Sequence, residues 1–322
     1  MNIRQLADYS RRLKGEATRL AQIPLALASS LRGHDQQYER EGYRVFNQRL
    51  NLAAVQRARD VIGQEVFRCE TPLRRHPTGN VETHAFVDPD GDSSRRYVRN
   101  ALANPHQESA LPATRAAFLD LICSPELRDC LRELDGADEY AIHQIVLFFV
   151  GPGMEPHVDG WFLDTVPHGG AHTVWIPLED TTTVNGPTCI FRWPRRRFLD
   201  GKALGLGDSF ASEDVDFSEY LRYQKAIIDR ARSENPSMIV PQMKKGDFAV
   251  WSSLTPHGTL PARREGVSRL SLQVLVRPTK LKWGTFREIE FQKKPREDAG
   301  RPFRAGWSLI EPDWDSRPIQ PT

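Results

Sequence analysis

The sequence predicts a mainly β protein with flanking helices, built around an antiparallel sandwich or barrel. Beyond residue 136 the chain alternates between short apolar runs and turn residues such as Gly, Pro, Asn and Asp. Several short strands with few helices between them are typical of such folds. Hydrophobic residues form 39% of the chain and charged residues 27%, as in an ordinary globular protein. The strand-like runs are YAIHQIVLFFV, HTVWIPL, TCIFRW, DFAVWSS and RLSLQVLV.

The region before residue 136 is predicted to be mostly helical. Residues 1–33 have a helical pattern, residues 43–46 alternate like a short strand, and Asn51 is suited to cap a helix that begins at Leu52. Residues 85–112 are rich in turn formers, so we expect a long loop that covers part of the molecule.

Two further helices are predicted just before the strands, at residues 113–123 and 125–134. Ser124 is a plausible N-cap for the second, and Pro125 fits its first helical position.

The 322 residues are interpreted as one domain with three parts. Residues 1–135 form a helical support, residues 136–278 the β core, and residues 279–322 a C-terminal arm that makes a subunit contact or a lid. The core carries an insertion at residues 199–240, with a glycine-rich loop and an amphipathic helix, which we expect to close over a bound ligand.

Charge and cysteine content narrow the class of protein. A net charge of +2 argues against a nucleic-acid binder, which would carry a strongly basic surface. No CxxC pair occurs, so reduced thiols and a cytoplasmic location are expected. Residues 20–31 are too short and interrupted to span a membrane. The basic and apolar pattern of residues 3–23 fits either a helix packed on the protein body, which we favour, or a helix lying on a membrane surface. The cysteines are Cys69, Cys123, Cys130 and Cys189.

A histidine and a carboxylate stand two residues apart where the first long strand gives out. His157 and Asp159 share one face of an extended segment, whereas Val158 faces the other way. One imidazole and one carboxylate thus converge on one point. The sequence therefore predicts two ligands of a metal site.

The third ligand is predicted to be His257. It lies at the end of a strand, and a further strand returns past it. On that returning strand Arg269, Ser271 and Gln273 share one face and alternate with leucine and valine. The polar face of this strand is therefore expected to point into the same site.

Two histidines and one carboxylate on a β scaffold are typical of non-heme Fe(II) oxygenases, because they leave metal positions open. An α-keto acid can chelate through its keto oxygen and nearby carboxylate, and O2 can take the remaining position. The far carboxylate of such an acid needs a cation. Arg269 offers a two-pronged guanidinium for it.

The sequence resembles the phytanoyl-CoA dioxygenase family of Fe(II)/2-oxoglutarate-dependent oxygenases. The shared features extend from EREGYRVF to RLSLQV. Between these segments they include HVD, VWIPLED, the NGPT turn, KKGDFAVW and HGT, and the shared arginine is Arg269. The resemblance implies a double-stranded β-helix, also called a jelly roll or cupin-like fold. It implies Fe(II) held by His157, Asp159 and His257, with 2-oxoglutarate and O2 as co-substrates.

Further site residues follow from the same resemblance. Arg269 matches the arginine that binds 2-oxoglutarate, and Trp175 and Thr259 match other co-substrate contacts. Gln144 is a looser match, and Ser271 is a candidate because it shares the face of Arg269. Because an anionic ligand stands at Asp159, hydroxylation or another C–H oxidation is implied rather than halogenation.

The substrate is predicted to be a small, anionic metabolite or biosynthetic intermediate. Family members commonly carry a Gly-Ser-His element after the Asn-Gly turn. This chain departs from them there, because an arginine run follows the turn instead. Arginine binds carboxylate or phosphate, and an aromatic side chain can cover a ring. A solvated charge run explains the arginines equally well. The candidate substrate residues are Trp161, Trp193, Arg195, Arg196 and Arg197.

Two other classes of protein share part of this pattern. A non-catalytic jelly-roll binding protein would be expected to lose at least one of the three ligands or Arg269. A zinc-dependent hydrolase would also use two histidines and a carboxylate, but no general base such as that of HExxH stands beside them. Metal content and succinate formation distinguish these alternatives.

Overall fold

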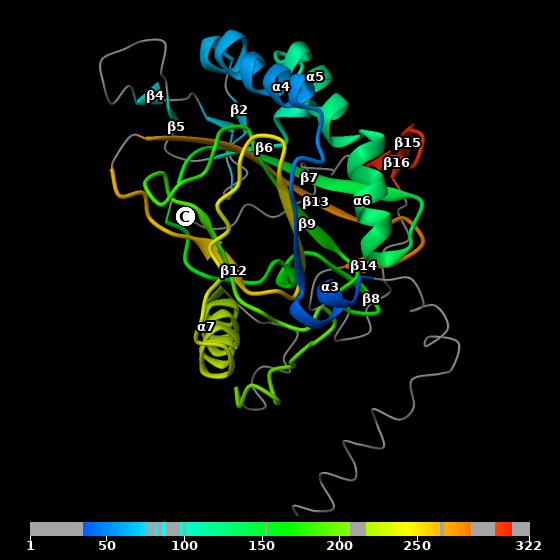
Figure 1. Cartoon of the computed structure of the whole chain (residues 1–322), viewed down its shortest axis with the longest axis vertical. Helices are drawn as coiled ribbons and strands as arrows, with labels where there is room; N and C mark the ends of the chain where they lie inside the picture. The colour runs from blue at the N-terminus through cyan, green and yellow to red at the C-terminus, as the bar shows by residue number, and fades with distance from the viewer. Residues whose placement is uncertain are drawn as a thin grey trace, which may run out of the picture.

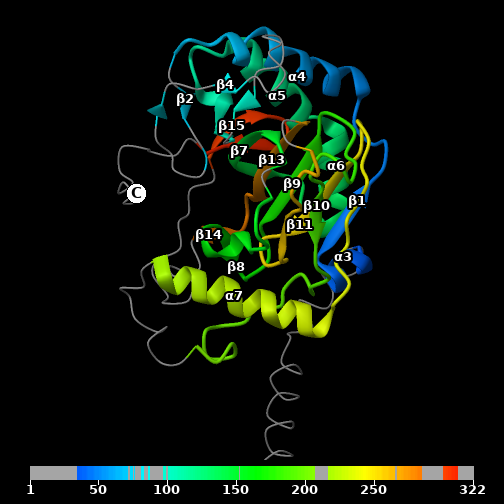
Figure 2. The same ribbon diagram turned by 90° about the vertical axis from the view of Figure 1, so that its left-hand side faces the viewer.

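The computed structural model shows a β barrel with helices on two opposite sides (Figure 1). Helices α4 (Leu52–Gln64) and α5 (Pro112–Ile122) lie on one side of the barrel, and α7 (Phe217–Glu234) crosses the other (Figure 2). The structure describes residues 35–71, 73–74, 76, 101–151, 153–206, 217–264, 267–284 and 300–310, and the backbone of residues 81–82, 86–87 and 97–98. The predictions for residues 1–33 and most of the 85–112 loop lie outside the described residues.

The main sheet has eight strands, and the expected antiparallel order holds for most of it. Its path runs β1-β11-β9-β13-β7-β16-β15, with β6 on the side of β7. Only β16 pairs in parallel among the described strands, next to β7. The bounds are β1 (Tyr43–Phe46), β6 (Leu102–Ala103), β7 (Tyr140–Val150), β9 (His172–Pro177), β11 (Phe248–Ser252), β13 (Ser268–Pro278), β15 (Arg301–Arg304) and β16 (Trp307–Leu309).

Alternation along these strands gives the main sheet two different faces. In β9, Val174 and Ile176 belong to the large core under the helices. Trp175, between them, points into the barrel and packs with Trp251 and with Ile190 of the opposite strand β10 (Thr188–Ile190). Period-two alternation thus separates a structural core from a barrel interior. The predicted jelly roll is confirmed by this facing of two sheets.

Short paired strands complete the barrel. The pair β10 (Thr188–Ile190) and β12 (His257–Thr259) faces the main sheet. The predicted run TCIFRW is therefore a strand for only three residues, and His257 opens a strand rather than ending one. The other pairs are β8 (Asp164–Val166) with β14 (Lys282–Gly284), β2 (Leu73–Arg74) with β3 (Val81–Glu82), and β4 (Phe86–Val87) with β5 (Tyr97–Val98).

Two helices of the first half, those that begin at Leu52 and Pro125, start where the sequence predicted. The side chain of Asn51 accepts hydrogen bonds from the amides of Ala53 and Ala54, and Ser124 accepts one from the amide of Leu127. These caps satisfy amides that have no partner inside the helix. The helices are α3 (Gln36–Glu41), α4 (Leu52–Gln64), α5 (Pro112–Ile122) and α6 (Pro125–Asp135), with short 3₁₀ turns at Val66–Arg68, Pro105–Gln107 and Asp159–Trp161.

Two features of the second half refine the expected layout. The insertion contains the predicted helix, α7 (Phe217–Glu234). Within the predicted C-terminal arm, the described strand β16 joins the main sheet beside Tyr140, and its Trp307 is buried. All four cysteines are free, as expected. No helix in the described ranges has the length and apolar character needed to cross a membrane.

Candidate metal centre and co-substrate pocket

The backbone of residues 157–159, which we call the HxD segment, pairs with β12 and so brings the three predicted metal ligands together. The His157 amide donates to the His257 carbonyl at 2.8 Å, and the His257 amide donates back at 2.9 Å. Reciprocal bonds of this kind place two opposite residues side by side, as in an antiparallel ladder. The imidazole rings of His157 and His257 accordingly lie 4.5 Å apart between centroids.

The ligand atoms of the three side chains meet at one point. The Nε2 atoms of His157 and His257 lie 3.7 and 3.6 Å from the two oxygens of Asp159. One ligand atom from each residue lies within 4.8 Å of the others. In the part of the chain that the structure describes, this is the one such group of histidine, cysteine, aspartate or glutamate side chains.

Hydrogen bonds on the far side of each ring fix which nitrogen is free. The Nδ1 of His157 lies 2.9 Å from the Glu155 carbonyl, and that of His257 lies 3.0 Å from the Thr255 carbonyl. A carbonyl only accepts, so each Nδ1 carries the proton and donates it. Each Nε2 is left with a lone pair aimed at the cluster. This arrangement is the one that metal-binding histidines use.

The protonation states also suit a metal. Burial lowers the pKa of His257 to about 4, so this ring is neutral at pH 7. Burial alone would raise the pKa of Asp159, but the two histidines and a hydrogen bond from the Thr173 hydroxyl hold it below its usual range. Asp159 is therefore an anion. Neutral imidazole and carboxylate are the forms that bind a metal ion.

The residues present fit an iron ion. The Nε2 of His257 is buried and has no hydrogen-bond partner, which is costly unless another group takes its lone pair. Two histidines and one carboxylate on one side of an ion leave positions for further ligands. The donor set thus matches a 2-His-1-carboxylate site.

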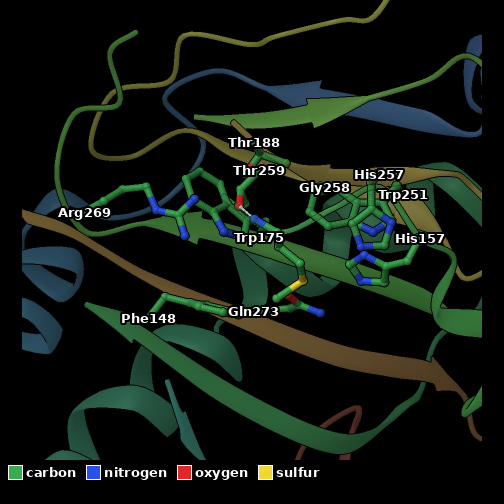
Figure 3. Close-up of a pocket in the computed structure, with 11 residues that line it drawn as sticks. Phe148, His157, Trp175, Thr188, Trp251, His257, Gly258, Thr259, Arg269 and Gln273 are labelled. Carbon is green, nitrogen blue, oxygen red and sulfur yellow. Dashed lines mark hydrogen bonds between the residues drawn. The ribbon is translucent and has the colours of Figure 1, made fainter. Parts of the chain in front are cut away.

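A pocket extends from the two histidines toward Arg269 (Figure 3). Figure 3 shows His157 and His257 at one end, Arg269 at the other, and Trp175 with Thr259 between them. The pocket is lined by Phe148, Met154, His157, Trp175, Thr188, Trp251, His257, Gly258, Thr259, Arg269 and Gln273. A short molecule with two anionic ends could reach both the metal centre and the guanidinium.

Arg269 is a buried cation that lacks a carboxylate partner among the described residues. Its side chain is fully buried, and the guanidinium lies near the rings of Phe148 and Trp175. It donates only to two backbone carbonyls, those of Gly186 at 2.9 Å and Val150 at 3.3 Å, and its Nε has no partner. Burial lowers its pKa to about 9. Buried charges are normally paired, so this pocket calls for an anionic ligand.

The other predicted co-substrate residues divide into two groups. Trp175 and Thr259 line the pocket, and the Thr259 hydroxyl accepts a hydrogen bond from the Met154 amide at 2.7 Å. Ser271 is buried on the inner face of β13 with an unpaired hydroxyl, but it does not line the pocket. Gln144 lies farther along β7 and does not line it either.

Several pocket residues were not predicted. Phe148 lies on the inner face of β7, so strand alternation could have found it, whereas Gln273, which also lines the pocket, lies on the polar face of β13 that was expected to point into the site. Trp251 could have been found in the same way on β11. His76, which stands in loop sequence, lies beside Phe148 but does not itself line the pocket. Burial lowers the pKa of its imidazole to about 4, although the negative charge of Asp159 opposes this shift.

The predicted substrate arginines are engaged elsewhere. Arg195 is buried and donates to Glu39 at 2.6 Å and to the Gly169 carbonyl at 3.1 Å. Arg197 forms a two-pronged pair with Glu234, and Arg196 lies 3.8 Å from Glu39. None of the three lines the pocket. Their placement gives no support to the predicted anionic substrate.

The two predicted substrate tryptophans belong to a core under α7. Trp161 and Trp193 are buried in the same apolar cluster. The Trp193 indole N–H donates to the Arg197 carbonyl at 2.8 Å, and the Arg197 guanidinium lies over its ring. Trp161 packs near Tyr220 and Tyr223 of α7. Both tryptophans thus have structural partners.

A jelly roll with a 2-His-1-carboxylate cluster and a buried arginine defines the class of non-heme iron oxygenases that use 2-oxoglutarate. The model of the phytanoyl-CoA dioxygenase (PhyH) family matches residues 38–270 of the chain. The chain therefore belongs to this family, and it is an Fe(II)/2-oxoglutarate-dependent oxygenase.

Solved structures of other proteins show the same fold. The epimerase SnoN, in complex with Fe3+, α-ketoglutarate and nogalamycin RO, is 15% identical with a TM-score of 0.54 and covers 90% of this chain and 98% of its own. The carbocyclase SnoK from nogalamycin biosynthesis is 14% identical with a TM-score of 0.55, covering 87% and 93%. EctD from S. alaskensis with bound Fe is 16% identical with a TM-score of 0.53, covering 85% and 85%. No curated protein matches the sequence.

Proposed function

We propose that this enzyme oxidises a C–H bond of a small organic molecule, with hydroxylation as the default outcome. The observation that carries the proposal is the buried, carboxylate-free Arg269 at the far end of the pocket that begins at His157 and His257. This pairing of a metal centre with an isolated cation suits 2-oxoglutarate, a keto acid with two carboxylates. A zinc hydrolase would have no use for the arginine.

Each residue has a distinct role in the proposal. His157, Asp159 and His257 hold Fe(II) through the two Nε2 atoms and one carboxylate oxygen. When bound, iron and 2-oxoglutarate supply the oxidising chemistry and release succinate and CO2. Arg269 binds the far carboxylate, and Trp175, Phe148 and the β sheet around them exclude water, which strengthens that ion pair.

Affinity for 2-oxoglutarate is expected to fall as the pH rises above about 9. The pKa of Arg269 is about 9 without a bound anion, and a bound carboxylate raises it because it favours the charged form. The complex therefore holds more protons than the free enzyme above that pH, so binding weakens there. The KM for 2-oxoglutarate, measured from pH 7 to 10, should rise. In Arg269→Gln the KM should be raised throughout, without this pH dependence, and a parallel rise in both proteins would contradict the assignment.

The reaction itself is tested by succinate release. Compounds that stimulate succinate formation from 2-oxoglutarate are candidate substrates, and their products should be heavier by one oxygen in mass spectrometry. Structures of SnoN and EctD are complexes with nogalamycin RO and 5-hydroxyectoine, both small molecules, which supports a screen of small metabolites. A product of unchanged mass would indicate epimerisation instead of hydroxylation. A product lighter by two hydrogens would indicate desaturation or ring closure. A product that carries chlorine would contradict the proposal, because Asp159 stands where chloride would have to bind.

A further inference from the structure

One side chain of the inserted helix α7 contacts the backbone of the metal-binding segment. Gln224 is 6% exposed, and its Oε1 accepts a hydrogen bond from the Val158 amide at 2.9 Å. Its Nε2 donates to the Val158 carbonyl at 3.1 Å. The side-chain amide of Gln224 thus pairs with both the N–H and the C=O of Val158, which lies between the ligands His157 and Asp159. The two residues are 66 positions apart in the sequence.

The two hydrogen bonds complete the pairing of the HxD segment on its second edge. On the first edge, the amide and carbonyl of His157 pair with His257. On the second edge no strand pairs with Val158 among the described residues, and Gln224 takes that place. The backbone of His157 and Val158 is therefore held from opposite sides. This is the extended geometry that points His157 and Asp159 to one face.

Helix α7 is itself anchored, so it can act as a fixed support. Val158 packs in one buried cluster with Tyr223 and Ile227, which flank Gln224 on the helix. At the far end of the helix Glu234 pairs with Arg197. The ring of Tyr220, one turn before Gln224, lies 5.5 Å from that of Trp161, two residues after Asp159, so this face of α7 packs against the metal-binding segment.

We propose that Gln224 is a positioning residue for the metal centre: through Val158 it sets the spacing and orientation of His157 and Asp159 and so tunes iron affinity. The inference rests on the proposed function of these ligands. It also assigns the insertion a role beyond covering the site, because α7 becomes part of the structure that holds the metal. Partners of this kind around metal ligands typically change metal affinity by about 10–100-fold when removed.

The test is anaerobic titration of the protein with Fe(II) in the presence of saturating 2-oxoglutarate, followed by the visible charge-transfer band. Gln224→Leu keeps the size of the side chain and removes both hydrogen bonds. The apparent Kd for Fe(II) is expected to rise by about 10–100-fold, and the band maximum to shift. At saturating iron the KM for 2-oxoglutarate should change less than twofold, because Arg269 is untouched.

Gln224→Glu tests the proposal with an acceptor in the same place. It retains the bond from the Val158 amide, loses the donor to the carbonyl, and should give an Fe(II) Kd between those of the wild type and Gln224→Leu. This variant is also the one to measure if Gln224→Leu does not fold. The inference would be overturned if Gln224→Glu binds Fe(II) with the wild-type Kd and Gln224→Leu, where it folds, does so too.

Two control variants separate positioning from general support by the helix. Ile227→Ala removes packing from the same buried cluster without touching a hydrogen bond to Val158, and Lys225→Ala alters an exposed ion pair with Asp229. Both should keep an Fe(II) Kd within about threefold of wild type even where thermal stability falls. If Ile227→Ala weakens iron binding as much as Gln224→Leu, the role of Gln224 is structural only. If the wild type gives no band, the proposed function itself fails, which is a different result.

Discussion

Replacing His157 by alanine is expected to abolish succinate formation and the stabilisation of the protein by Fe(II). Fe(II) stabilises the folded protein only by binding to it, and the variant would keep only two of the three protein ligands. At an Fe(II) concentration of 100 times its Kd, the wild type should gain about 2.7 kcal/mol of unfolding free energy, and the variant close to none. Thermal unfolding with and without Fe(II), followed under anaerobic conditions, measures this difference.

The metal-free variant should remain folded, which makes the result specific. The side chain of His157 is 19% exposed, and the two hydrogen bonds that join its segment to His257 are made by the backbone. His168→Ala is a matched control, because His168 is 22% exposed and lies outside the metal cluster. That control should keep the full shift with Fe(II). A His157→Ala protein that still binds Fe(II) with wild-type affinity would contradict the ligand assignment.

The second large effect concerns stability rather than catalysis. Asp135→Ala is expected to lower the free energy of unfolding by about 3–5 kcal/mol, the usual cost of removing one partner of a buried ion pair. Asp135 lies 2.6 Å from His172, accepts from the Tyr140 hydroxyl at 2.6 Å and from the Ala137 amide at 2.8 Å. Arg195 lies 3.9 Å away. Urea denaturation at pH 7 measures the loss.

The pH dependence of this effect has a definite sign. Burial alone would raise the pKa of Asp135, but the hydrogen bond and charge of His172, with Arg195 and Tyr140, hold it far below its usual range. A carboxyl group with a lowered pKa stabilises the fold above its unfolded pKa, about 3.9, and this contribution is lost as the pH falls further. The gap between wild type and Asp135→Ala should therefore narrow in acid. Asp138→Ala, at a position 81% exposed, should change stability by no more than about 0.5 kcal/mol. An equal loss in both variants would refute a buried network.

The metal cluster and Arg269 could be predicted because strand geometry is local. Alternation places His157 and Asp159 on one face, and the same rule places Arg269 opposite the core leucines of β13. Caps such as Asn51 and Ser124 also act within three residues along the chain. Features of this kind depend only on nearby sequence.

Long-range partners could not be predicted in this way. The arginine run at residues 195–197 reads as surface charge, yet Arg195 is buried because Glu39 and Asp135 come to it from distant segments. Gln224 looks like any polar residue of an amphipathic helix until the helix is placed against Val158. Likewise, nothing local shows that Trp307 joins the edge of the main sheet. Each of these depends on tertiary packing, which the pattern of a single segment does not contain.

The most direct test of the account is the visible spectrum of the purified protein with Fe(II) and 2-oxoglutarate in the absence of oxygen. A keto acid that chelates iron at His157, Asp159 and His257 should produce a weak metal-to-ligand charge-transfer band. His257→Ala should remove the band, and in Arg269→Gln it should appear only at much higher 2-oxoglutarate concentration. A protein that gives no band under any of these conditions, and instead retains zinc tightly, would contradict the assignment as a 2-oxoglutarate-dependent oxygenase.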